Sequence, residues 1–280
     1  YYLDELGRLY PMLKEDRQPQ VVATIGEDHE NYLSAIDTFS IAAQSGGDDD
    51  TVRAWRMADG LGLFWWVRGH WGAAGRILAQ VLELPSREAA SPDRVQVLLW
   101  RGHFLSNTGR TVEARQVLDA AVAEARVLGI RGLIGRALSY RGQLAYAKSH
   151  YEESIALMAE ALEIHRERGD RRATAIALAS LGNAEEMLRM IREAIPRFEE
   201  SLRTARESKD SQNVGYALQR LAHLAVIEGR LDDAERYALL LGIGLENDGF
   251  HLVSLLVVLD GVLAGPVPVE VGQVNHAVDA

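Results

Sequence analysis

Small and apolar residues recur along the chain at a constant spacing of forty positions. A step of forty residues connects a series of small residues, namely Gly62, Gly102, Gly142, Gly182 and Ala222. The same step connects a series of mostly large apolar residues, namely Leu78, Leu118, Met158, Phe198 and Ala238. A fixed internal period of this length is typical of solenoids, in which similar units stack on one another.

Each period contains two amphipathic helices. Leu178, Leu181, Gly182 and Glu185 fall at positions i, i+3, i+4 and i+7, which share one helical face. A second segment repeats this spacing with Ala194, Phe198, Ser201 and Leu202. The pattern therefore predicts a helix, a short turn and an antiparallel helix in every unit.

The ends of the chain are less regular than its middle. Helices are expected over residues 2–14 and 18–44, followed by a polar turn at 44–51. We predict N-terminal helices in residues 1–50, a repeat domain in 51–265 and an irregular tail in 266–280. The segment 251–265 is apolar nearly all round, so we expect the tail, a second copy of the chain or a further helix to cover it.

The repeat resembles the tetratricopeptide repeat. The best match to that motif consists of Ala58, Leu61, Gly62, Trp65, Trp71, Ala74 and Leu78. The resemblance implies an all-α, right-handed superhelix of about five 40-residue helix pairs plus terminal helices. Arg101, Arg141 and Glu185 depart from the motif, and the period is forty rather than the usual thirty-four residues.

A second resemblance concerns the start of the repeat region. The stretch GEDHENYLSAIDTF at 26–39, followed by LGLFWWVRGHWGAAGRILAQVLEL at 61–84, is similar to the C-terminal repeat region of bacterial regulators of the signal-transducing ATPase (STAND) class. In that class such a region serves as the sensor or interaction arm of a multidomain transcriptional regulator. This resemblance implies a regulatory module without catalytic activity.

Composition excludes several other functions. The chain of 280 residues has no cysteine and a net charge of −10, which argues against thiolate metal sites and against binding of nucleic acid by this segment. We see neither a secretory signal nor a membrane span, so we expect a cytoplasmic protein. No phosphate-binding loop, metal-ligand spacing or nucleophile motif occurs, and we expect no cofactor and no enzyme. Adjacent glutamates such as Glu185 and Glu186 are expected on solvated faces.

One stripe on the first helix of each pair is the candidate binding surface. In tetratricopeptide proteins the corresponding stripe lines the concave groove, where polar side chains can hydrogen-bond an extended protein or peptide segment. The candidate residues are Arg56, Asp59, Trp66, His103, Asn107, Gln143, Tyr146, Asn183, Glu186, Gln219 and His223. The alternatives are that this stripe is merely hydrated, or that it binds a small-molecule inducer. Trp65 and Trp71 are expected in the core, and Trp100 between units.

Overall fold

The computed structural model describes residues 1–9, 12, 18–87 and 90–243. Within these ranges the chain forms α-helices and no strand, as the repeat pattern predicts. The helices are α1 (Tyr2–Leu9), α2 (Gln18–Glu27), α3 (His29–Gln44), α4 (Asp48–Val67), α5 (Trp71–Leu82), α6 (Pro92–Asn107), α7 (Thr111–Leu128), α8 (Arg131–Ala147), α9 (Tyr151–Glu167), α10 (Arg171–Met187), α11 (Ile191–Glu207), α12 (Ser211–Ile227) and α13 (Leu231–Ile243).

Helices α4 to α13 alternate in sequence as the first and second helices of five pairs, which confirms the predicted architecture. The chain divides into two compact units, Tyr1–Leu144 and Ala145–Ala280. The predicted domain boundary after residue 50 stays a prediction. The one after residue 265, with the apolar segment 251–265 and the tail, lies outside the described residues.

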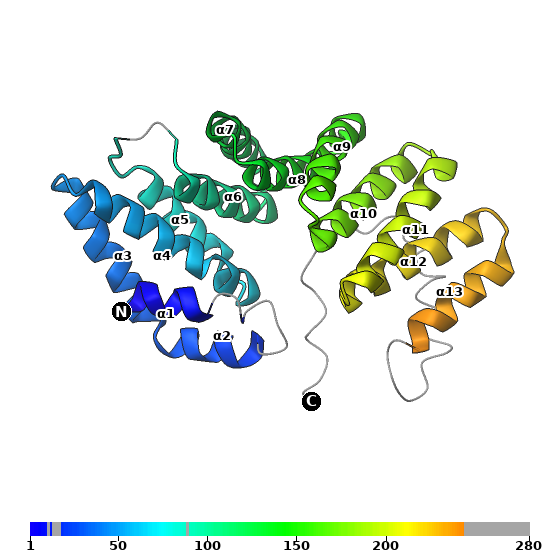
Figure 1. The fold of residues 1–280 in the computed structure, drawn as a ribbon, viewed down its shortest axis with the longest axis horizontal. Helices are drawn as coiled ribbons and strands as arrows, with labels where there is room; N and C mark the ends of the chain where they lie inside the picture. Colours follow the sequence, from blue (N-terminus) through cyan, green and yellow to red (C-terminus); the bar gives the residue numbers. More distant parts are fainter. Residues whose placement is uncertain (10–11, 13–17, 88–89, 244–280) are drawn as a thin grey trace. The chain divides into compact units, whose positions relative to one another are not determined.

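In the first unit, α4 and α6 each pack against their own second helix, and α4 also packs against the next first helix. Helix α4 contacts α5 and α6, and α6 contacts α7; Figure 1 shows these helices next to one another. Trp55, Trp65 and Phe104 are fully buried between them. The Trp55 Nε1–H donates a hydrogen bond to the Val81 carbonyl of α5 at 2.7 Å, so the indole satisfies its polar group inside the core.

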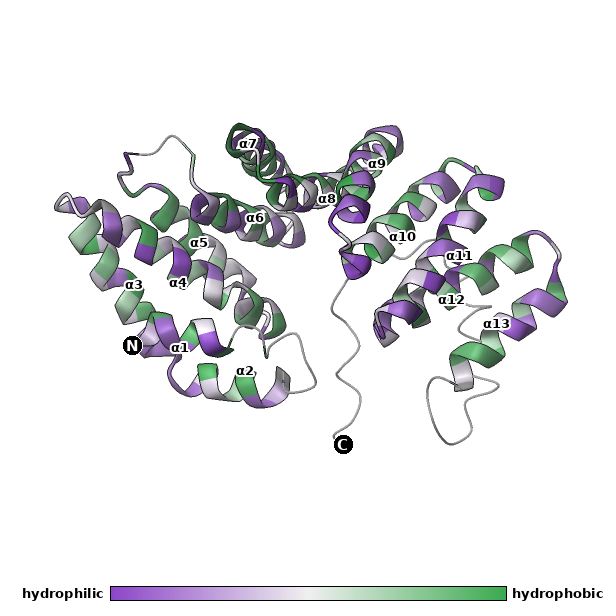
Figure 2. Ribbon diagram, in the orientation of Figure 1, coloured by the Kyte–Doolittle hydropathy of each residue, from purple (hydrophilic) through white to green (hydrophobic). Residues whose placement is uncertain are grey.

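The second unit repeats this packing. Helix α10 contacts both α9 and α11, and α12 contacts both α11 and α13. Phe198, Leu218 and Ala222 lie at its centre. Figure 2 shows hydrophobic and hydrophilic residues alternating around the helices of each unit, as expected for helices that bury one stripe and expose another.

Small residues of the forty-residue series lie where two helices approach closely. A Cβ atom added to Gly102 would lie 2.5 Å from Leu118 side-chain atoms, and one added to Gly182 would lie 2.8 Å from the Phe198 ring. One added to Gly62 would overlap the Trp100 indole. These positions therefore require glycine because of packing, as the sequence predicts.

The turns repeat with the same period. In each of the five helix pairs, the turn between the two helices contains a left-handed residue. These residues are Gly69, Gly109, Ser149, Arg189 and Gly229. The turns between pairs contain another such series, which consists of Gly129, Gly169 and Lys209. The backbone thus keeps one turn geometry even where the sequence does not supply glycine.

The N-terminal helices differ from the prediction. Residues 18–44 were expected to form one helix, but the chain breaks at Asp28, which has φ −101° and ψ 10°. The Asp28 carboxylate accepts a hydrogen bond from Asn31 Nδ2 at 2.8 Å. Aspartate makes such polar contacts at helix starts in preference to helix interiors, so it separates α2 from α3. Helix α1 ends at Leu9, and most of residues 10–14 lie outside the described residues.

Candidate functional site

Four aromatic side chains of the first unit form a cluster, and we call Trp66, Trp71, His103 and Tyr140 the aromatic cluster. Trp66, His103 and Tyr140 belong to the first helices α4, α6 and α8, and Trp71 begins the second helix α5. The Trp66 and Trp71 rings stack with centroids 5.0 Å apart and an interplanar angle of 16°. The His103 ring lies 4.2 Å from the Trp66 ring and 5.1 Å from the Tyr140 ring. All four residues are partly buried. Their rings therefore pack against one another and still expose surface that a ligand can contact.

Local hydrogen bonds hold this cluster in place. The Trp71 Nε1–H donates to the Trp66 carbonyl at 3.1 Å across the turn between α4 and α5. Trp71 was expected in the core, but only Trp65 is fully buried, with 1% of its surface exposed. Trp71 begins α5, where it stacks on Trp66 and packs against the core cluster of the first unit with part of its surface exposed. Trp71 therefore belongs to the core only in part, because it stands at the start of its helix.

The imidazole of His103 is neutral under ordinary conditions. Burial lowers the pKa of His103 to about 4, because the charged form loses hydration among the surrounding rings. A neutral imidazole offers one donor and one acceptor to a ligand instead of a charge. The aromatic cluster is therefore uncharged.

The candidates near this cluster have internal partners. The Trp100 Nε1–H donates to Asp59 Oδ1 at 2.9 Å, which connects α6 to α4. Trp100 thus packs between two neighbouring helix pairs of the first unit, as expected. Arg56 is exposed and lies 3.2 Å from the Asp93 carboxylate. The structure assigns Asp59 a structural contact with Trp100.

Asn107 and Gln143 are the two further candidates of the first unit. Asn107 is exposed at the end of α6, where its Nδ2 donates to the His103 carbonyl at 2.8 Å. Gln143 is partly buried on α8.

The second unit contains a polar cluster on α10 and α12, which we define as Asn183, Glu186, Tyr216, Arg220 and His223. The Tyr216 hydroxyl donates to Asn183 Oδ1 at 2.8 Å. The Arg220 guanidinium pairs with the Glu186 carboxylate, and His223 Nδ1 lies 3.3 Å from Glu186 Oε1. Each contact joins two neighbouring first helices.

Charge within the polar cluster is balanced. Burial acts to raise the pKa of Glu186, but its contacts with His223 and Arg220 outweigh this effect, so the pKa is lowered. Burial, together with the nearby Tyr216 hydroxyl, raises the pKa of Tyr146 to about 12. The tyrosines therefore stay neutral, and Glu186 carries a negative charge that Arg220 compensates.

The polar cluster corrects two expectations. Asn183 and Glu186 were expected to offer open polar groups, but only 4% and 7% of their surfaces are exposed. Glu185 was expected on a solvated face, yet it is 4% exposed and pairs with Arg197 at 3.2 Å. Both glutamates are buried because an arginine of a neighbouring helix neutralises each of them. Gln219 is partly buried on α12.

Tyr140, Tyr216 and Arg220 were not predicted from the sequence as members of these clusters. Trp100, Tyr140 and Arg220 share one phase of the forty-residue step, three positions before the phase of His103 and His223. Tyr216 belongs to another phase of the step, which also contains Gln96 and Arg136. The side chains of Gln96 and Arg136 hydrogen-bond each other at 2.5 Å. A search along the forty-residue step for long polar and aromatic residues would therefore have found Tyr140, Tyr216 and Arg220.

Metal and membrane chemistry receive no support from the residues that the structure describes. Within those ranges, no group of three or more histidine or acidic side chains is arranged to hold a metal ion. None of the described helices combines the length and the apolar character needed to cross a membrane.

Comparison with known proteins agrees with the repeat architecture. Residues 133–207 match the family model of the tetratricopeptide repeat. No curated protein matches the chain. The fold is similar to that of BtubC (BKLC) from P. vanneervenii, with a TM-score of 0.66, 12% sequence identity and coverage of 91% of this chain and 98% of that one.

Two Rap proteins have similar structures. The apo form of RapI gives a TM-score of 0.66 at 12% identity and covers 94% of this chain and 82% of its own. A Rap protein complexed with competence and sporulation factor gives a TM-score of 0.61 at 14% identity and covers 87% and 75%. The fold is therefore a tetratricopeptide-like solenoid.

Proposed function

We propose that this protein is a non-catalytic interaction module that binds a protein or peptide segment along its first helices. The aromatic cluster carries this proposal. Partly exposed tryptophan and tyrosine side chains supply much of the affinity in protein interfaces, because they bury a large area at a small cost in conformational entropy. Trp66 is the central member, since it contacts both Trp71 and His103.

The polar cluster has a different part in this proposal. Its side chains already bond one another, so a ligand gains little from Asn183 or Glu186. The aromatic cluster therefore provides the main contact, and the predicted polar residues of the second unit stabilise the helices. The similar Rap protein, which is complexed with competence and sporulation factor, supports the choice of a protein or peptide ligand.

The regulatory context rests on the resemblance to the STAND class. In that context this chain is the sensor arm of a multidomain bacterial transcriptional regulator and acts in the cytoplasm. A small-molecule inducer is the second candidate ligand, since the stacked pair of Trp66 and Trp71 presents a flat surface beside a neutral imidazole. Self-association through 251–265 stays a separate prediction.

Peptide selection followed by mutagenesis tests the proposal. A peptide selected from a displayed library against the chain should lose at least about tenfold in affinity with Trp66→Ala, which corresponds to about 1.4 kcal/mol, while Trp66→Phe should retain most of it. Tyr1→Ala is the control, because Tyr1 is an aromatic residue that is 80% exposed and directly precedes α1.

A thermal-shift screen with metabolites distinguishes the second candidate. A ligand at about 100 times its dissociation constant stabilises a protein by about 2.7 kcal/mol. The small-molecule sensor would be favoured if a metabolite stabilised the parent but not Trp66→Ala, and if no selected peptide depended on Trp66. Peptides that bind equally well to the parent and to Trp66→Ala would reject the proposed surface.

A further inference from the structure

Helix α3 exposes the stripe that the other second helices bury. At the forty-residue step, three residues of α3 correspond to three residues of α5. Ser34, Thr38 and Ile41 correspond in this order to Ala74, Leu78 and Val81. The three α5 residues are at most 1% exposed, whereas Ile41 is 67% exposed and Ser34 and Thr38 are also exposed.

The same positions are buried further along the chain. In α7 these positions are Ala114, Leu118 and Ala121, and in α11 they are Ala194, Phe198 and Ser201. All six residues are at most 1% exposed. Their burial comes from the first helix of the same pair, because Leu118 lies against Gly102 and Phe198 against Gly182. Within the described part of the chain, α3 therefore has the form of a second helix whose first helix is not among the described elements.

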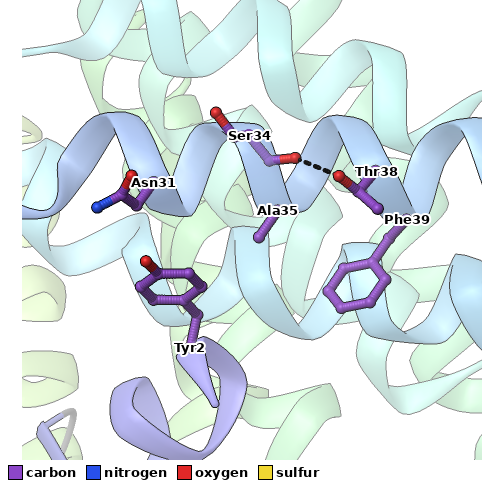
Figure 3. Close-up of a pocket in the computed structure, with 6 residues that line it drawn as sticks. All are labelled: Tyr2, Asn31, Ser34, Ala35, Thr38 and Phe39. Carbon is purple, nitrogen blue, oxygen red and sulfur yellow. Dashed lines mark hydrogen bonds between the residues drawn. The ribbon is translucent and has the colours of Figure 1, made fainter.

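The preceding helices leave this stripe open. Helix α2 buries Val21, Val22 and Ile25 in the core cluster that contains α4 residues. Helix α1 contributes Tyr2 to the surroundings of the stripe. Between Tyr2 and α3 lies a depression of about 290 Å³, which Figure 3 shows. Its lining residues are Tyr2, Asn31, Ser34, Ala35, Thr38 and Phe39.

The hydroxyl groups in the depression do not oppose its burial by another helix. Thr38 Oγ1 donates to the Ser34 carbonyl at 2.8 Å, the contact that is dashed in Figure 3. Ser34 Oγ donates to the Glu30 carbonyl at 2.9 Å. Because both hydroxyls already have partners on α3 itself, covering them leaves no donor unsatisfied.

The surroundings of the stripe are acidic. Glu30 and Asp37 are exposed beside it on α3, and Asp4 is exposed on α1. Helix α3 contains no lysine or arginine, and α1 contributes only Arg8. An incoming helix with basic residues along its edges thus meets opposite charge, whereas an acidic helix meets like charge.

We propose that the Ser34, Thr38 and Ile41 stripe of α3 docks an amphipathic helix of a partner protein, with an alanine- and leucine-rich face and flanking lysine or arginine. The partner helix takes the place that a first helix occupies in each following pair. Its apolar face covers Ala35 and Ile41, and its basic edge lies against Glu30 and Asp37. This surface is separate from the aromatic cluster, since it belongs to α3, whereas the aromatic cluster lies on α4, α5, α6 and α8.

Two synthetic helical peptides test this docking site. One carries an alanine and leucine stripe with lysine flanks, and the other has glutamate at every lysine position. By fluorescence anisotropy the lysine peptide should bind the full chain at least about ten times more tightly than the glutamate peptide. Thr38→Lys should weaken binding of the lysine peptide by about tenfold or more.

Ala123→Lys supplies the matched control, because it adds the same charge at an exposed position of α7. Circular dichroism of both variants should match that of the parent. Equal binding of the lysine peptide to Thr38→Lys and Ala123→Lys would overturn the proposal. So would a parent dimer that Thr38→Lys converts to a monomer, because the occupant would then be a second copy of this chain.

Discussion

Gly182 of α10 lies directly against the Phe198 ring of α11: a Cβ atom at Gly182 would lie 2.8 Å from Cε2 and Cζ of that ring. Gly182→Ala should therefore lower the free energy of unfolding by about 1 to 3 kcal/mol, because the ring must shift within a packed core. Gly75→Ala is the matched variant. No atom lies within 4 Å of a Cβ at Gly75, inside α5, so this change should stabilise the protein by about 0.5 to 1 kcal/mol.

Urea unfolding of both glycine variants measures this contrast. If both substitutions changed the free energy of unfolding in the same direction, Gly182 would not have the packing role that the forty-residue period predicts.

The left-handed turn residues provide a second prediction. Ser149 has φ 60° and Arg189 has φ 62°, at positions where neighbouring repeats have glycine. A left-handed conformation costs a non-glycine residue about 1 to 2 kcal/mol, while glycine loses about 0.4 to 1 kcal/mol through its more flexible unfolded state. Arg189→Gly should thus stabilise the protein by about 0.5 kcal/mol or more.

The reverse change at the same phase is the control for this prediction. Gly109→Ser, at φ 78°, should destabilise the protein in the same thermal or urea assay. The turn account would be wrong if Arg189→Gly lowered the melting temperature.

The pH dependence of stability should contain a contribution from His103. Its pKa is about 4 in the folded state and near the ordinary value of 6.5 when unfolded. Below pH 6.5 the unfolded chain binds a proton that the folded chain does not, so stability falls as the pH drops from 6.5 toward 4. The loss should reach about 2 to 3 kcal/mol near pH 4.

His103→Gln removes the titrating group and keeps a polar side chain. The difference in unfolding free energy between parent and variant should therefore change between pH 7.5 and pH 5. A constant difference across that range would show that the His103 imidazole is hydrated and not buried among the rings.

The ion pair of Arg220 and Glu186 is the subject of a fourth prediction. Only 14% and 8% of these side chains are exposed, so Glu186→Met leaves a buried guanidinium without its anion and should cost about 3 kcal/mol or more. Adding Arg220→Met should recover most of this loss, because replacing both charges removes the unpaired one.

The more exposed pair of Arg166 and Glu200 is the control. Its side chains are 38% and 29% exposed, and Glu200→Met should change stability by less than about 1 kcal/mol. If the double variant of Arg220 and Glu186 were as unstable as Glu186→Met alone, the burial of an unpaired charge would not be the cause.

The sequence predicted the helix pairs because packing repeats with the chain. Gly102 and Gly182 mark close helix contacts, and one phase of the step reaches both. The sequence did not predict the burial of Glu186, since its partner Arg220 lies thirty-four positions away on another helix. A hydrophobic period identifies the face of a helix. It does not identify which charges meet across two helices.

The N-terminal break and the partial exposure of Trp71 were missed for a related reason. Both depend on local geometry at a helix start, at Asp28 and at the turn before α5. The apolar and polar pattern of the sequence continues through Asp28, so only the turn contacts of that residue reveal the break.

Hydrogen–deuterium exchange with a selected peptide locates the binding surface without a mutation. We expect the peptide to slow exchange in α4 and α6, which carry Trp66 and His103, and in the turn before Trp71. The same protection should be absent with a scrambled peptide. Protection confined to α7 or to the α3 stripe, with α4 and α6 unchanged, would contradict binding along the first helices.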